Sequence, residues 1–153
     1  MTDLQKLREW IATFPEFDIL SRFQVDSTDR VPNQGGIFPG GLVEISRQST
    51  ICGGVVVTNQ LNFAVYYVFA KAVEDDTDAA FNADWVLSFQ RWVQEQSVLG
   101  LAPKFGNTDQ RTEQIKAENG TLYDAEESGT AMYAVQISVR YKILYQEENE
   151  WLM

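Results

Sequence analysis

The sequence contains no histidine and a single cysteine in 153 residues. Without histidine, Ser-His-Asp and Cys-His catalysis and the His-dependent zinc hydrolases are excluded. Cys52 has no partner for a disulfide within the chain, so packing alone must hold the fold, which suits a reducing compartment. Because Cys52 stands beside Gly53 and Gly54, we interpret it as a small buried or turn residue and not as a nucleophile.

Long apolar runs and basic residues are also scarce. No stretch approaches the roughly 20 apolar residues of a membrane-spanning helix, and the chain begins with a polar, charged segment unlike a signal peptide. We therefore expect a cytoplasmic protein with no membrane partner. Lys and Arg number 12 against 22 Asp and Glu, giving a net charge of −10. This charge argues against specific nucleic-acid binding, which depends on cations that neutralise phosphates.

Motifs for phosphate or dinucleotide binding are missing from the sequence. The acidic cluster Asp75, Asp76 and Asp78 could cap a helix and favour its dipole, or it could bind a metal ion. We favour the cap, because no other ligands stand at a recognisable spacing. A catalytic pair of carboxylates stays open, although no two acidic residues are singled out. We therefore expect no enzyme activity, no catalytic residues, no metal and no cofactor.

Two segments show the apolar spacing of helices packed against a sheet. Thr2 and Gln5 have the form of a capping box before the first helix, and Pro15 should stop it. A longer helix is predicted over residues 75–96. The apolar positions of the first segment are Leu4, Leu7, Trp10, Ile11 and Phe14, and the aromatic stripe of the second is Phe81, Trp85, Phe89 and Trp92.

Alternation of apolar and polar residues predicts the strands. Residues 17–25, 42–48, 55–73, 112–119 and 131–146 have this pattern, and the stretch 46–54 should turn one strand back on the next. Residues 31–41 hold two Pro and four Gly, so we predict a long loop there, either a binding loop or a flexible connection. Residues 97–110 should be irregular, and residues 119–130 should form a turn region.

These elements predict an α+β fold. With 44% apolar and 12% aromatic residues, residues 1–153 should form a single domain with one core. The expected architecture is a mostly antiparallel sheet with long strands and two helices packed on one face.

The last strand has a length that a small monomer does not need. Residues 131–146 would extend roughly 50 Å, whereas a compact chain of this size is only about 40 Å across. A strand that protrudes leaves unpaired N–H and C=O groups, which can pair with a neighbouring chain. Repeated head-to-tail pairing closes into a ring if its rotation allows. In the predicted loop, Ile37 and Phe38 are apolar residues set among glycines, and we expect them to contact a neighbouring subunit or a tube protein.

Three segments together resemble a known family. They are VPNQGGIFPGGLVEISR (31–47), RWVQEQSVLGLAPKFG (91–106) and IKAENGTLYDAEESGTAMYAVQISVRYKILY (115–145). They are similar to the minor capsid or minor tail proteins encoded by prophages of gut Firmicutes. The resemblance covers nearly the whole chain and carries no catalytic residues.

Size, element order and long strands are also similar to the tail terminator proteins of long-tailed phages. That resemblance implies a ring, with six copies expected, that caps the tail tube and meets head-completion proteins. It also implies a virion component assembled in the bacterial cytoplasm. The acidic charge would let DNA slide through such a ring. A head-tail connector, a tail completion protein and a binding module unrelated to phage are the alternatives.

Overall fold

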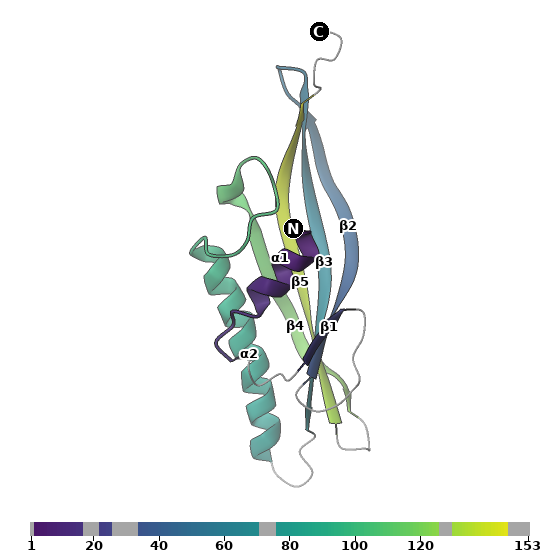
Figure 1. Cartoon of the computed structure of the whole chain (residues 1–153), viewed down its shortest axis with the longest axis vertical. Helices are drawn as coiled ribbons and strands as arrows, with labels where there is room; N and C mark the ends of the chain where they lie inside the picture. The colour runs from purple at the N-terminus through teal and green to yellow at the C-terminus, as the bar shows by residue number, and fades with distance from the viewer. Residues whose placement is uncertain (1, 17–21, 26–33, 71–75, 126–129, 147–153) are drawn as a thin grey trace.

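The computed structural model of the chain describes residues 2–16, 22–25, 34–70, 76–125 and 130–146 (Figure 1). In chain order they form α1 (Asp3–Ile11), β1 (Arg22–Val25), β2 (Gln34–Ser49), β3 (Gly54–Ala70), α2 (Asp76–Val98), the 3-10 helix η2 (Gln110–Thr112), β4 (Gln114–Ala125) and β5 (Thr130–Gln146). The predicted α+β class is confirmed. Most predicted elements are present, and two predicted irregular segments are wrong.

All five strands belong to one sheet with the order β1-β2-β3-β5-β4. The short β1 runs parallel to β2, and the other neighbouring pairs are antiparallel. The centre of the sheet is the β3–β5 pair, whose register runs without a break from Gly54↔Gln146 to Ala70↔Thr130. The turn at residues 50–53 joins β2 and β3. The distal part of this hairpin and the end of β5 extend beyond both helices (Figure 1).

One face of the sheet carries the core, and both helices lie on that face. Alternate residues of the central strands point toward the helices, as the alternation predicts. The sheet contributes Ile37, Phe63, Val65, Tyr67, Ile115, Val135, Ile137, Val139 and Tyr141 to the main buried cluster, and the helices contribute Leu7, Trp10, Ile11, Trp85, Val86, Phe89 and Val93. The prediction of two helices on one face is therefore confirmed.

The first helix begins and ends close to the predicted positions. The Thr2 hydroxyl accepts a hydrogen bond from the backbone N–H of Gln5 at 3.2 Å, which satisfies one of the free donors at the helix start. The helix ends at Ile11, before Pro15. The Trp10 ring of α1 stacks on Trp92 of α2 with ring centroids 4.7 Å apart. This contact joins the helices into one layer.

The aromatic stripe of α2 faces the sheet. Trp85 and Phe89 are buried, and both contact the ring of Tyr67 on β3, at centroid distances of 4.3 and 5.3 Å. The indole N–H of Trp85 donates to the carbonyl of Glu16 at 3.1 Å. The side chain of Phe81 lies outside the described residues. For Trp85 and Phe89 the predicted packing on the sheet is confirmed, whereas the ring of Trp92 contacts Trp10, Phe14 and Phe89.

The predicted loop at residues 31–41 is wrong from residue 34 onward, because β2 starts at Gln34. Glycine and proline are typical of loops, yet they are also compatible with an edge strand that contains bulges. The register with β3 shifts between Pro39 and Gly41, so Gly40 is an extra residue. Gly41 has φ +90°, and a Cβ on Gly40 would lie 3.0 Å from the Asn62 carbonyl oxygen. Both positions therefore favour glycine.

The predicted turn region at residues 119–130 is wrong up to residue 125, because β4 continues to Ala125. Asn119 has φ 58°, and the register with β5 shifts between Glu118 and Thr121. The Asn-Gly pair thus forms a bulge inside a strand instead of a hairpin turn, since Asn tolerates the left-handed conformation in either setting. The strand predicted over residues 112–119 is consequently longer than its alternation indicated.

Candidate interaction surfaces

The edge of the sheet formed by β4 is closed by side chains of α2. The N–H of Ile115 donates to Ser97 Oγ at 3.1 Å, and the carbonyl of Ala117 accepts from Gln90 Nε2 at 3.1 Å. Gly120 allows close contact here, because a Cβ on it would overlap the Gln90 side chain and lie 2.7 Å from Val86. Helix α2 therefore satisfies outward backbone groups of this edge strand.

The distal part of β5, beyond the start of β4, is closed by the segment that follows α2. The Asn107 side chain accepts from the N–H of Leu144 at 2.7 Å and donates to the carbonyl of Leu144 at 3.1 Å. The Asn107 amide thus makes the pair of hydrogen bonds that the backbone of a neighbouring strand would make. The Glu113 carboxylate holds the same segment in place, since it accepts from the N–H groups of Phe105 at 2.7 Å and Gly106 at 3.3 Å.

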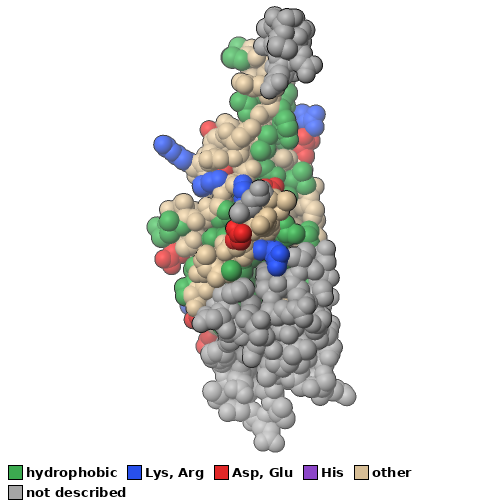
Figure 2. Space-filling model, viewed as in Figure 1, with side chains coloured by type: hydrophobic (Ala, Val, Ile, Leu, Met, Phe, Trp, Pro, Cys, Tyr) green, Lys and Arg blue, Asp and Glu red, His purple; other side chains and the backbone are tan. Residues whose placement is uncertain are grey.

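The edge formed by β2 is open over most of its length. Strand β1 pairs only with Gln34–Ile37, so residues 38–49 have no strand on their outer side within the described part of the chain. The residues from Gly41 to Ser49 are all exposed. Leu42, Val43 and Ile45 are apolar residues in this stretch, and Ile51 at the tip of the hairpin is fully exposed, at 105%. We call these four residues the hairpin patch. In Figure 2 hydrophobic side chains reach the surface along this protruding part of the molecule.

The part of β2 that carries the hairpin patch contains a second bulge and an ion pair. The register with β3 shifts between Glu44 and Ser46, which makes Ile45 an extra residue. The bulge brings Glu44 and Arg47 to the same face, where Arg47 Nη2 lies 2.7 Å from Glu44 Oε1. Bulges and charges on an edge strand hinder backbone pairing with another sheet. The patch therefore offers apolar side chains more readily than backbone groups.

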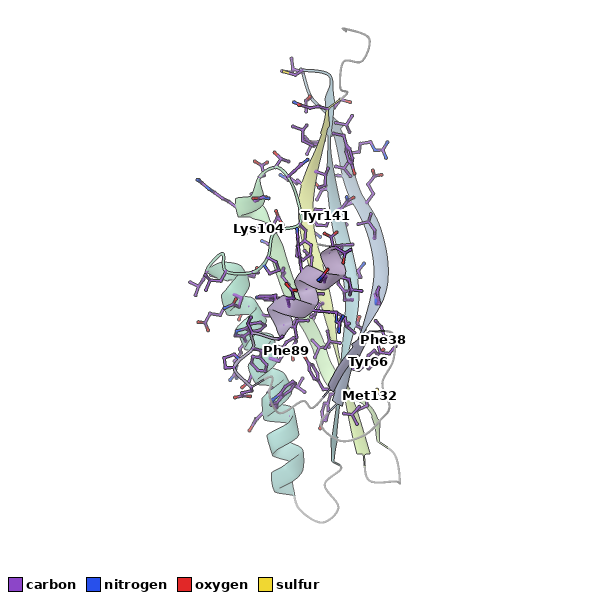
Figure 3. All side chains as sticks on the ribbon, viewed as in Figure 1. Phe38, Tyr66, Phe89, Lys104, Met132 and Tyr141 are labelled. Carbon is purple, nitrogen blue, oxygen red and sulfur yellow. The ribbon has the colours of Figure 1, made fainter. Side chains whose placement is uncertain are left out.

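The residues predicted as subunit contacts lie on opposite faces of β2. The side chain of Ile37 is fully buried in the core, at 0% exposure, so it is not available to a neighbour. Phe38 is partly buried on the other face of the sheet, where its ring packs edge to face with Tyr66 at 4.8 Å (Figure 3). A contact through Phe38 stays a prediction.

The sequence did not single out the hairpin patch as a contact surface. A signal was present, because residues 42–48 carry Leu42, Val43 and Ile45 on both alternating faces while no helix pattern lies nearby to cover them. A strand that is apolar on both faces is either central in a sheet or part of an interface. A central strand and an interface strand are distinguished here only by the position of β2 at the edge of the sheet.

Two hollows lie elsewhere on the described surface. A shallow hollow of about 270 Å³ lies on the face of the sheet away from the helices, and amide, hydroxyl and charged side chains such as Gln60, Ser138 and Arg140 line it. A groove of about 810 Å³ lies between α2 and β4. Among the described residues, no group of three or more Cys, Asp or Glu could hold a metal ion. Asp75 and the side chains of Asp76 and Asp78 lie outside them.

Cys52 lies in the turn of the hairpin and is exposed, as the turn interpretation predicts. Among the described residues, three tyrosines have altered pKa values. Burial raises the pKa of Tyr67 well above its usual value, and burial is also the first cause of the raised pKa values of Tyr133 and Tyr141. These phenols stay neutral and contribute packing.

Neither a protein-family model nor a curated protein matches the chain, so the comparisons assign it to no family. Within the described residues, the structure has no helix with the length and apolar character needed to cross a membrane.

Proposed function

We propose that this chain is a structural protein of a phage tail, a tail terminator that caps the tail tube as a ring of identical subunits, with six copies expected. The observation that carries the proposal is the hairpin patch. Its four apolar side chains are exposed, and the turn at residues 50–53 extends beyond both helices (Figure 1). Exposed apolar residues on a protruding segment are typical of a protein interaction surface.

The two sides of the sheet differ in how their edge strands are covered, and this difference supports assembly through two different surfaces. Side chains of α2 close the β4 edge, and Asn107 closes the distal edge of β5. Within the described residues, β2 beyond Ile37 has no strand on its outer side, and the proposal assigns the partner to this side. A contact between two different surfaces repeats around a ring when its rotation closes. The resemblance to prophage minor tail proteins supports a phage tail as the place where such a ring acts.

The proposal is tested by deleting the gene from an inducible prophage and examining the particles by electron microscopy. We expect tails of uncontrolled length, because nothing caps the growing tube. Particles of normal form and infectivity would contradict the proposal. Tails of normal length without heads would instead assign the chain to the head-tail connection.

Complementation connects the particle defect to the hairpin patch. A plasmid copy with Ile45→Lys should fail to restore particles, because a charge replaces an apolar contact residue. Gln48→Lys is the matched control, since Gln48 is an exposed polar residue of the same strand, and it should restore them. Full restoration by Ile45→Lys would remove the hairpin patch from the proposed role.

A further inference from the structure

The groove between α2 and β4 combines exposed apolar residues with cations. Leu87 and Val98 of α2 line it, and both are exposed, Val98 at 79%. Arg91, Arg111 and Lys116 also line it. None of these cations forms an ion pair with another residue of the described part of the chain. On a protein with a net charge of −10, the groove is a local surface suited to an acidic partner.

The acidic residues of the groove leave its cations largely uncompensated. The Glu113 carboxylate is buried and is occupied by the backbone N–H groups of Phe105 and Gly106. Glu118, inside β4, is exposed and is the one other acidic residue among the described residues that line the groove, against three cations. A ligand that brings carboxylates and apolar side chains together would therefore match both components of the groove.

The backbone of β4 cannot extend the sheet without losing bonds that it already has. Ser97 and Gln90 bind backbone groups of Ile115 and Ala117 along this edge. A strand added here would displace these side chains. The occupant is accordingly recognised by its side chains, and a compact projection fits the groove better than a long strand.

The distal end of the same protein has the required chemistry. Ile51 projects from the turn between β2 and β3, and Gln146 at the end of β5 pairs with Gly54 beside that turn. The sequence that continues from Gln146 is EENEWLM, which has three glutamates and no lysine or arginine. An exposed isoleucine thus lies at the end of the described chain from which this acidic sequence continues.

We infer that the groove of one copy receives the hairpin turn, residues 50–53, of a second copy. This inference rests on the proposed self-assembly and names the surface that accepts the hairpin. The donor hairpin and the acceptor groove lie toward opposite edges of the sheet, on the β2 and β4 sides. The contact is therefore head to tail, and each copy keeps a free groove and a free hairpin for the next neighbour.

The native Cys52 in the turn provides a direct test. Val98→Cys places a second thiol at the groove, and mild oxidation of the concentrated full-length protein should join Cys52 of one copy to position 98 of the next. Gel electrophoresis without reductant should show a ladder of dimers, trimers and larger species that ends at the closed ring. The ladder should be lost in the Val98→Cys Cys52→Ser double variant, which retains the groove thiol alone.

A matched control places the new thiol outside the groove. Glu9 is an exposed residue of α1, so Glu9→Cys should give little more cross-linked product than the wild type. Arg91→Glu, added to Val98→Cys, should weaken the ladder and should remove its dependence on low salt, because the groove loses a cation that attracts the acidic end.

The outcomes separate this inference from the proposed function. Equal ladders from Glu9→Cys and Val98→Cys would overturn the inference, as would cross-linking of the wild type through Cys52 alone, which indicates a symmetric dimer. Oligomers seen by analytical ultracentrifugation without cross-linking at position 98 would overturn the inference that the groove receives the hairpin turn. They would still support self-assembly. A groove-specific ladder together with normal particles from the gene deletion would support the groove and contradict the tail role.

Discussion

Replacing Trp85 by alanine should open a hole between α2 and β3. The Trp85 side chain is 3% exposed, its ring lies 4.3 Å from the ring of Tyr67 and 5.4 Å from that of Phe14, and its N–H donates to the Glu16 carbonyl. The substitution therefore removes apolar burial, aromatic contacts and a hydrogen bond that ties the end of the α1 segment to α2.

The magnitude follows from the buried area. A buried tryptophan removes about 150–250 Å² from water, which at about 25 cal/mol per Å² corresponds to roughly 4–6 kcal/mol. Alanine retains part of this, and measured losses for large core aromatics are about 3–5 kcal/mol. We expect a loss in that range in the free energy of unfolding. For a chain of this size, the melting temperature should fall by roughly 6–20 °C.

The assay is urea unfolding followed by far-ultraviolet circular dichroism, in dilute protein so that assembly does not contribute. Leu87→Ala is the control, because Leu87 lies on the same helix two residues away and is 45% exposed. The control should cost less than about 1 kcal/mol. A cost below about 1 kcal/mol for Trp85→Ala as well would refute the conclusion that the aromatic stripe packs on the sheet.

Three further substitutions test other contacts. Glu113→Ala should lower the free energy of unfolding by about 1–3 kcal/mol, because it leaves backbone N–H groups without their carboxylate, and unchanged denaturation would contradict that role. Gly120→Ala should cost about 1–3 kcal/mol through overlap with Gln90 and Val86, and a melting temperature equal to the wild type would show that the bulge does not hold α2 close. Burial raises the pKa of Tyr67, so the folded protein keeps the phenol proton at a pH where the unfolded chain loses it. The stability from this difference is complete below about pH 10 and is lost as the pH rises further, by at most about 1.4 kcal/mol per pH unit. Tyr67→Phe should therefore lose less stability than the wild type above about pH 10 in the same denaturation assay, and identical alkaline profiles would show that Tyr67 contributes no such difference.

The elements that the sequence predicts well are those whose periodicity matches their burial. Strand β5 alternates because one face meets the helices, and α2 repeats its aromatics because one side meets the sheet. The failures at residues 34–41 and 119–125 have a common cause. Glycine, proline and asparagine permit turns, but they also permit bulges, and only the neighbouring strand determines which of these forms.

The candidate surfaces could be predicted only in part. The excess strand length indicated an interface, but the choice of Ile37 as an exposed contact failed because β2 turns that side chain under the helices. The closed edges depend on side chains far along the chain from the groups they bind, such as Asn107 and Leu144, or Gln90 and Ala117. No local pattern contains such pairings, so the open part of the β2 edge could not be located from the sequence.

The bulges of β2 have a consequence for changes in chain length. At Gly40 and at Ile45, β2 is one residue longer than β3, while the flanking pairs, such as Pro39↔Phe63 and Gly41↔Asn62, meet consecutive residues of the partner. Deleting either extra residue would leave every flanking pair in place. The shortened strand would, however, lose the local twist that the bulge gives it. A single-residue deletion could thus preserve the fold of the subunit and still convert a limited assembly into open-ended fibrous aggregation, because a flat exposed strand pairs with its own copies.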